Sequence, residues 1–343
     1  MGKRQVVGVD IGSSLIKIIA VEGFPKKPKI VKFAMEYIEP HVIVDGEVMD
    51  KEIVVETLKR LCEKTGISTN EVIASIPSRD VIVKKIKMAK MKESEAAEQI
   101  KWEAEQYIPY GIEDVVLDFQ ILNPDVGENM MEVLLVGAKK DSVDARLVLL
   151  RDAGLNPVVF EIPIFAIQNI YEYNYGVDSK SLIGHIHIGA QFTSISYVQG
   201  AINHFTREIT TAVNTLIQAI QRELGVNRER ALNMIIGKTT EDVDQFSFKN
   251  AFQSFLDDLG VSVERVLPYI PEGFDKLDKI ILSGGGALIT NLSDFFYQRF
   301  GINVEILDPL KKFEIAPNAY EEDLRKIAPI IALPLGLTLR GEG

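Results

Sequence analysis

Two stretches of the chain, residues 9–23 and 186–200, share one pattern of apolar and polar positions. Each is a run of mostly β-branched apolar residues, a short turn with glycine, and a second run of high β propensity, which is typical of a β-hairpin. At one constant offset, five residues of the first stretch recur in the second: Ile11, Gly12, Ile18, Val21 and Gly23 as Ile188, Gly189, Ile195, Val198 and Gly200. The repeat predicts two related lobes.

Helical periodicity follows each hairpin. An apolar stripe closed by Gly225 predicts a core-facing helix over residues 213–224. A second helix is expected from about Glu93 to Tyr107, before Pro109 and Gly111. Strand-like runs on both sides of this second helix indicate a compact α+β insertion between the lobes.

A third pattern joins a strand to a helix through consecutive glycines. The apolar run 280–282 enters Ser283 and then Gly284, Gly285 and Gly286, and apolar residues at helical spacing follow. Bare glycine backbone lets a flat ring or a phosphate lie close, and a helix N-terminus adds the positive end of a dipole.

The segment from Ile327 to Leu339 is the longest apolar stretch. It is too short to span a bilayer and contains Pro329 and Pro334. These prolines and the alternation of leucines over 335–339 argue against a membrane-targeting helix. We expect a buried segment that folds back on the first lobe.

Composition narrows the class of protein. The 343 residues are 46% hydrophobic and 25% charged, enough for about two domains with real cores. A formal net charge of -11 argues against nucleic-acid binding and against a polybasic membrane surface. The single cysteine, Cys62, and four histidines offer neither a disulfide nor a zinc site, so a reduced intracellular protein is expected. Residues 1–9 leave no room for the apolar core of a signal peptide.

The first hairpin contains groups suited to phosphate. Gly12 lets backbone approach an anion, Ser13 and Ser14 can donate hydrogen bonds, and Lys17 adds a positive charge. Asp10 could hold a hydrated magnesium ion. The alternative is an ordinary hairpin with an aspartate at its turn and a surface lysine.

Two phosphate-type hairpins followed by a strand, three glycines and a helix resemble the superfamily of actin, heat-shock chaperones and sugar kinases. Three runs are more specific: EAEQYIPYGIEDVVLDFQIL, MMEVLLVGAKKDSV and RDAGLNPVVFEIPIFAIQN resemble the PilM family of type IV pilus assembly, which is related to the division protein FtsA. These runs fall in the insertion and its exit, where this family differs from actin.

The resemblance implies an α/β, actin-like (ribonuclease H-like) fold of two lobes with an inserted α+β subdomain, 1C. Its parts are expected at 1–77 and 159–180 (subdomain 1A), 78–158 (1C), 181–225 and 276–326 (2A), 226–275 (2B), and 327–343, a return segment to 1A. ATP or ADP, with Mg²⁺ at Asp10, is expected between the lobes. The second hairpin would contribute Gly189, Ala190, Gln191 and Thr193 beside Gly284–Gly286, and no catalytic residue is assigned.

The same resemblance implies partners. Members of the family bind the cytoplasmic N-terminal tail of PilN in a groove between 1A and 1C. They are expected to self-associate into a ring under the inner membrane, close to the pilus motor ATPases. The chain is therefore expected to be cytoplasmic and to reach the membrane only through its partner.

Two positions depart from the family pattern. His187 stands where an aspartate matching Asp10 is expected, and a neutral imidazole is a poor ligand for magnesium, so hydrolysis should suffer more than binding. Alternatively, His187 only makes a local hydrogen bond. Leu232 and Ile235 stand where relatives contact the nucleoside with glutamate and lysine. Two lost contacts of about 1 kcal/mol each would lower affinity by roughly ten- to a hundredfold.

Three functions remain open from the sequence. The leading interpretation is a nucleotide-bound scaffold whose hydrolysis is weak or absent. An active ATPase or kinase of the superfamily is the alternative, but it requires a second acid, and the sequence shows no convincing one. A filament-forming cytoskeletal protein is the third.

Overall fold

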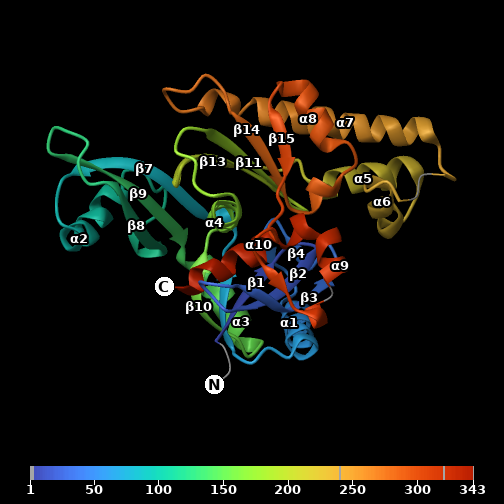
Figure 1. The fold of residues 1–343 in the computed structure, drawn as a ribbon, viewed down its shortest axis with the longest axis horizontal. Coiled ribbons are helices and arrows are strands. Elements are labelled where there is room, and N and C mark those ends of the chain that lie inside the picture. Colours follow the sequence, from blue (N-terminus) through green and yellow to red (C-terminus); the bar gives the residue numbers. More distant parts are fainter. Residues whose placement is uncertain (1–3, 239–240, 320, 343) are drawn as a thin grey trace.

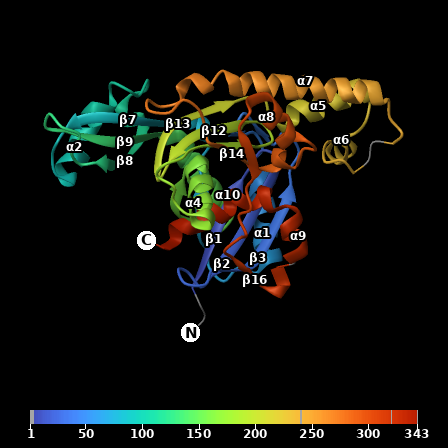
Figure 2. The same ribbon diagram turned by 45° about the horizontal axis from the view of Figure 1, so that its top comes forward.

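The structure is a computed structural model that describes residues 4–238, 241–319 and 321–342. It consists of two lobes and an outlying insertion. In Figure 1 the first lobe, with β1 and α1, lies at the bottom, the second lobe, with α7 and α8, lies at the top, and the insertion, with β7 and α2, projects to the left. Figure 2 shows the same arrangement with the top turned forward.

A six-stranded sheet forms the first lobe, in the order β10-β6-β1-β2-β3-β16. Its strands are β1 (Gln5–Ile11), β2 (Leu15–Glu22), β3 (Lys29–Tyr37), β6 (Glu71–Ser75), β10 (Asn156–Glu161) and β16 (Glu314–Ile315). Val7 and Val9 face helices α1 (Lys51–Thr65) and α3 (Lys140–Asp152), whereas Val6 faces α4 (Pro163–Tyr175) and α10 (Ala328–Thr338). Both faces of β1 are covered, which is why its apolar run is nearly continuous.

A five-stranded sheet forms the second lobe, in the order β13-β12-β11-β14-β15. Its strands are β11 (Leu182–Ile188), β12 (Thr193–Gln199), β13 (Ile202–Ile209), β14 (Lys279–Ser283) and β15 (Asn303–Ile306). Its helices are α5 (Val213–Leu224), α6 (Arg228–Ile235), α7 (Gln245–Glu264) and α8 (Leu292–Phe300), which share one buried cluster with the sheet. Helix α5 ends at Gly225 in the left-handed conformation, as the sequence predicts.

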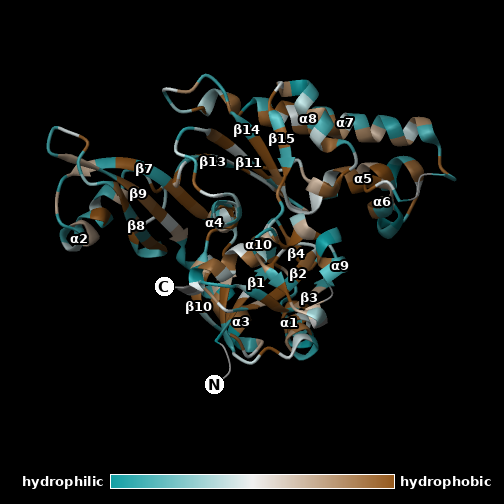
Figure 3. Cartoon of the chain, in the orientation of Figure 1, coloured by the Kyte–Doolittle hydropathy of each residue, from teal (hydrophilic) through white to brown (hydrophobic). Residues whose placement is uncertain are grey.

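Helices α4 and α10 contact both sheets. Ile167 of α4 and Ile331 of α10 belong to a buried cluster that includes Ile19 of the first sheet and Ile281 of the second. Figure 3 shows that brown, hydrophobic ribbon marks the strands of both lobes and much of α10. The two lobes are therefore joined by a continuous apolar core on this side of the molecule.

The two hairpins have the same turn. The amide of Gly12 donates to the carbonyl of Leu15 at 3.1 Å, and the amide of Gly189 donates to that of Phe192 at 2.9 Å. Asp10 pairs in register with Lys17, and His187 pairs in the same way with Ser194. The prediction of two related lobes is confirmed at the level of individual turns.

The insertion is a three-stranded sheet with one helix. Its strands β7 (Val81–Ala89), β8 (Val115–Asn123) and β9 (Met130–Lys139) have the order β7-β9-β8, and helix α2 (Glu93–Ala104) packs on them through Ile100 and Ala104. The range 78–158 expected for this unit also contains α3 and the first half of β10. By their contacts these two elements belong with the first lobe, because α3 packs on α1 and β10 pairs with β6.

Residues 328–338 form a helix, α10, although the sequence argued against a membrane-targeting helix there. Pro329 stands in the first turn, where a missing N–H costs nothing, and Pro334 lies inside the helix. The leucines over 335–339 do not mark one face of the segment, because Gly336 and Thr338 between them are buried as well. The expected burial against the first lobe is confirmed.

Short elements complete the described chain: β4 (Ile43–Val44), β5 (Glu47–Val48) and α9 (Glu321–Lys326). Within the described ranges, every helix is either too short or too polar to cross a lipid bilayer.

Candidate functional site

A cavity of about 660 Å³ lies between the lobes, and the turns of both hairpins and the glycine run after β14 open onto it. Ten of the residues predicted for the site line it: Asp10, Gly12, Ser13, Ser14, Lys17, Gly189, Ala190, Gln191, Gly284 and Gly285. Thr193 and Gly286 do not. Thr193 is fully buried, and its hydroxyl donates to the carbonyl of Thr211 at 2.8 Å.

The cavity is cationic although the chain is acidic. Among the described residues that line it, the basic side chains are Lys17, Arg79, Arg146, Arg228, Lys238 and Lys326, and the acidic ones are only Asp10 and Glu208. The net charge of the whole chain is -11, so this excess of positive charge is local. Such a concave, positively charged surface attracts an anionic ligand.

Asp10 and Lys17 form a buried ion pair across the first hairpin. They face each other in register, and the Lys17 ammonium donates to a carboxylate oxygen of Asp10. The carboxylate therefore already has a cationic partner, and Lys17 is not a free charge for phosphate. The sequence placed both residues at the site but did not foresee that they bind each other.

His187 occupies the equivalent position of the second hairpin and is neutral. Burial lowers its pKa to about 4, although Asp10 nearby acts in the opposite direction. Its Nδ1 atom lies 2.9 Å from the hydroxyl oxygen of Ser283, which is the local hydrogen bond considered from the sequence. Within the described ranges, no group of three or more His, Cys, Asp or Glu side chains is placed to hold a metal ion. With Asp10 paired to Lys17, these residues do not fit a directly coordinated magnesium ion.

The three glycines after β14 differ in what surrounds them. Gly284 has φ +81°, and a Cβ atom there would lie 2.5 Å from the carbonyl oxygen of Ile188. A Cβ atom on Gly286 would lie 2.2 Å from Cγ2 of Ile188. These two glycines therefore let the run pack directly on the second hairpin, whereas Gly285 has open space beside it and lines the cavity.

The end of the cavity near α6 is apolar. Leu232, Ile235 and Leu288 line it, and Lys238 also lines the cavity. Leu232 and Ile235 are the two positions where the sequence departs from the polar pattern of relatives. Apolar walls beside the bare backbone of Gly285 fit a flat ring system, and the opposite, cationic end fits phosphate groups.

Two hydrogen bonds, made by Arg228 and Gln191, join the two lobes across the cavity. The sequence did not predict either of them. Arg228, the first residue of α6, donates to the Ser14 hydroxyl at 3.1 Å and to the Asn214 side chain at 2.5 Å. The Gln191 amide donates to the carbonyl of Ile43 at 2.8 Å. The bond from Arg228 to Ser14 and the bond from Gln191 to Ile43 join the second lobe to the first beside the cavity.

Arg146 and Glu208 also line the cavity and were missed. Arg146 lies on the buried side of α3, near Leu149 and Leu150 in sequence, and a basic residue within an apolar stripe was the available signal. Glu208 accepts from the Ser194 hydroxyl at 3.1 Å. Burial raises the pKa of Glu208, partly offset by hydrogen bonds from Ser194 and Ser78. It is an acid beside the cavity that the sequence did not single out.

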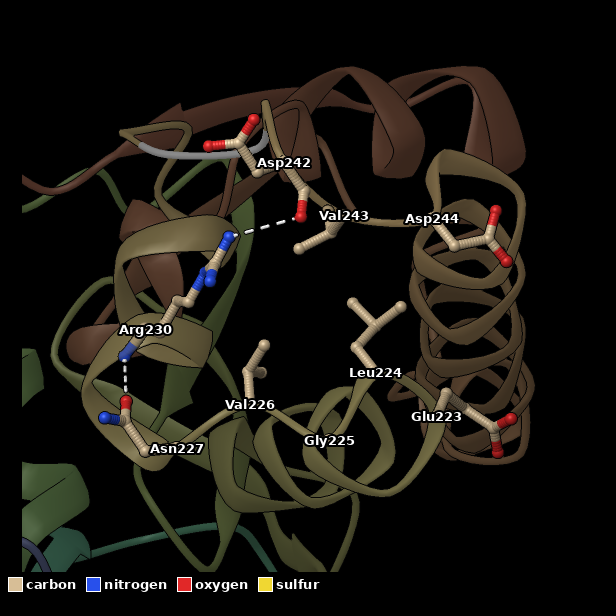
Figure 4. A pocket seen from close by; sticks show the side chains of 9 residues that line it. All are labelled: Glu223, Leu224, Gly225, Val226, Asn227, Arg230, Asp242, Val243 and Asp244. Carbon is tan, nitrogen blue, oxygen red and sulfur yellow. Dashed lines mark hydrogen bonds between the residues drawn. The ribbon is translucent and has the colours of Figure 1, made fainter.

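A second hollow, of about 620 Å³, lies away from these turns, between the end of α5, the start of α6 and the start of α7. Figure 4 shows Leu224, Val226 and Val243 pointing into it, with Arg230 directed to the carbonyl of Asp242. None of the predicted site residues lines this hollow.

Comparisons with known proteins agree with the geometry. Residues 8–342 match the family described as Type IV pilus assembly protein PilM. A solved structure of a PilM-PilN type IV pilus biogenesis complex is 27% identical, with a TM-score of 0.88 and complete coverage of both chains.

Two more distant structures show similarity of fold alone. The ethanolamine utilization protein EutJ from Carboxydothermus hydrogenoformans has 15% identity, a TM-score of 0.60, and coverage of 99% of this chain and 90% of its own. MreB5 of Spiroplasma citri bound to AMPPNP has 12% identity, a TM-score of 0.57, and coverage of 100% and 97%. The expected actin-like fold is confirmed, and the chain belongs to the PilM family of type IV pilus assembly proteins.

Proposed function

We propose that the chain is a nucleotide-bound scaffold of type IV pilus assembly that binds the cytoplasmic N-terminal tail of a PilN protein. The observation that supports nucleotide binding is the cationic cavity onto which both hairpin turns and the glycine run open. The phosphates would lie against the turns at Gly12 and Gly189, and the base would lie between Gly285 and the apolar wall of Leu232 and Ile235. ATP and ADP both suit this arrangement.

Mass spectrometry of the small molecules released when the purified chain is denatured tests the resident ligand. ATP or ADP in near-stoichiometric amount is the expected result. A ligand-free chain that also fails to bind added ATP or ADP by calorimetry would contradict the proposal.

Hydrolysis is proposed to be weak or absent. The support is chemical: Asp10 is paired with Lys17, and His187 is neutral and bound to Ser283. The competing function, an active ATPase, is favoured by Glu208, which lines the cavity and has a raised pKa suited to accepting a proton. Steady-state phosphate release separates the two. Turnover well above background that Glu208→Gln abolishes would establish the ATPase.

The PilN tail is proposed to bind at the junction of the first lobe and the insertion. Strand β8 is an edge strand of the insertion sheet and β10 an edge strand of the first sheet, and α3 contacts both. Each edge strand exposes a valine: Val116 is 46% exposed and Val158 is 51% exposed. Exposed apolar side chains on unpaired strand edges suit an added peptide.

Substitution of these valines tests the location. Val116→Asp and Val158→Asp should each weaken binding of a PilN-tail peptide by roughly tenfold or more, because a charge would be buried in an apolar contact. Val177→Asp is the matched control, since Val177 is 59% exposed in the loop after α4. Unchanged affinity in both edge-strand variants would place the peptide elsewhere.

Ring formation and contact with the motor ATPases belong to the same proposal. Light scattering of the purified chain with and without the peptide measures the first, and co-sedimentation with a motor ATPase measures the second. Sedimentable polymers formed on adding nucleotide would favour the filament-forming alternative.

A further inference from the structure

Arg146 is a buried cation without a partner for one of its nitrogens. Its side chain belongs to a residue that is only 6% exposed, and its Nη1 atom has no hydrogen-bond partner among the residues that the structure describes. It nevertheless lines the cavity between the lobes. Burial lowers the pKa of Arg146 to about 10, so the guanidinium is charged at neutral pH.

The acids near Arg146 are engaged by other groups. Asp10 is held by Lys17. Asp80 accepts from the Ser142 hydroxyl at 2.9 Å and lies 3.5 Å from the Lys139 ammonium. Neither acid therefore supplies a hydrogen bond to the Nη1 atom of Arg146. A buried guanidinium with an N–H group that lacks an acceptor is unfavourable, and an anion in the cavity would supply that acceptor.

We propose that Arg146 binds the terminal phosphoryl group of a nucleoside triphosphate and so distinguishes a triphosphate from a diphosphate. The inference rests on the proposed function, since it requires a nucleotide in this cavity. A guanidinium presents paired N–H donors that match phosphate oxygens, and such charged hydrogen bonds are strong in a buried site. The position of Arg146 beside Asp10, at the first hairpin, places it at the phosphate end rather than the apolar end.

The location of Arg146 also connects this contact to the insertion. Helix α3 begins directly after β9, the central strand of the insertion sheet. Asp80 lies just before β7, so its contacts with Lys139 and Ser142 tie together the two chain segments that enter and leave the insertion. A phosphoryl group bound to Arg146 would therefore restrain α3, the helix to which the insertion is attached.

Calorimetric titration of the full chain, freed of nucleotide, tests the inference. The ligands are ADP, a non-hydrolysable triphosphate analogue and inorganic phosphate alone. Arg146→Gln should lower affinity for the triphosphate analogue by roughly ten- to a hundredfold and leave ADP affinity within about twofold, because one charged contact is lost. Arg146→Lys, which keeps the charge, should retain part of the preference. Arg151→Gln, at an exposed position of the same helix, is the control and should change neither affinity.

Thermal melting and hydrogen exchange test whether Arg146 binds the ligand or only stabilises the fold. Without ligand, Arg146→Gln should melt at the same temperature as the wild type or higher, because an unpaired buried charge is removed. Hydrogen exchange in β7 and β9 should slow on adding the triphosphate analogue to the wild type but not to Arg146→Gln.

The outcomes separate this inference from the proposed function. A wild-type chain that binds neither nucleotide would overturn both. A chain that binds both nucleotides, with the two affinities changed equally or not at all in Arg146→Gln, would overturn the inference alone. Equal affinity for inorganic phosphate and the triphosphate analogue would overturn it in favour of a free-phosphate site.

Discussion

The two hairpins have the same backbone but different side-chain chemistry at one pair of positions. In the first, Asp10 and Lys17 face each other as an ion pair, and in the second, His187 and Ser194 face each other without charge. The sequence repeat predicts the shared turn, because glycine and β-branched residues determine it locally. It does not predict the ion pair, because whether a lysine turns to its cross-strand neighbour or to a ligand depends on what else fills the cavity.

A second histidine, His185, lies buried two residues before His187 and makes the free energy of unfolding depend on pH. His185 is 1% exposed, its ring nitrogens have no partners among the described residues, and burial lowers its pKa from 6.5 to about 4. The folded pKa lies below the unfolded one, so the stabilisation is complete above about pH 6.5 and is lost as pH falls toward 4. The loss reaches about 3 kcal/mol at pH 4 and below.

Urea unfolding at pH 7 and pH 4.5 should therefore show a smaller pH-dependent loss of stability in His185→Leu than in the wild type. His41→Leu, at an exposed position, should keep the wild-type dependence. Parallel pH profiles for His185→Leu and the wild type would show that His185 does not titrate as described.

Adjacent glycines should respond differently to the same substitution. Gly284→Ala forces a side chain into a left-handed backbone conformation against the Ile188 carbonyl, which should lower the free energy of unfolding by about 1–3 kcal/mol. Gly285→Ala meets no atom within 4 Å and should change stability by less than about 1 kcal/mol. Thermal or urea denaturation measures both, and equal losses in the two variants would contradict the assigned packing.

Among the elements, helix α10 and the α3–β10 segment differ most from what local sequence suggests. Pro334 signals a break, yet the helix continues because it is buried on all sides between the lobes, and tertiary packing outweighs a poor helix propensity. Strand β10 pairs with β6, more than eighty positions earlier, as the register of Asn156 with Glu71 shows. Such distant pairings leave no periodic trace in a single sequence.

Substitutions in the two C-terminal helices should separate packing from surface contacts. Leu335→Ala, at a fully buried position of α10, should lower the free energy of unfolding by about 2–5 kcal/mol, because the cavity it leaves is enclosed by both lobes. Arg325→Ala, at an exposed position of α9, removes only a surface ion pair with Glu321 and should cost less than about 0.5 kcal/mol. A small effect of Leu335→Ala would mean that α10 contributes little to the shared core.

At the scale of the whole molecule, local turns predicted the site's outline, and tertiary folding supplied its charge. Gly12, Gly189 and Gly284 line the cavity, and each is required by its own turn or close contact, which local sequence can indicate. Arg146 and Arg228 come from helices that are distant from those turns in sequence, and tertiary folding brings them to the cavity. For that reason the sequence indicated the glycine turns and Lys17 but not Arg146 or Arg228.

The cross-lobe bond of Arg228 should control how fast nucleotide leaves. Arg228→Ala removes the contact with Ser14 and should accelerate dissociation of a fluorescent ADP analogue by roughly tenfold or more, since a charged hydrogen bond across the cleft is lost. Arg230→Ala, in the same helix but facing the hollow of Figure 4, should leave the rate unchanged. Equal rates in a chase experiment for Arg228→Ala and wild type would mean that the cleft opens independently of this bond.

Because helix α10 lies near the C-terminus, it is among the last parts of the cavity wall to be synthesised. Ile330 and Leu333 form part of the cavity wall, and the Pro329 carbonyl accepts a hydrogen bond from the Gly284 amide at 2.9 Å. On the ribosome, both hairpins emerge long before this helix does. A nascent chain halted ahead of residue 328 would lack this part of the wall and the contact between Pro329 and Gly284, so we expect the cavity to reach its final form only after α10 is translated.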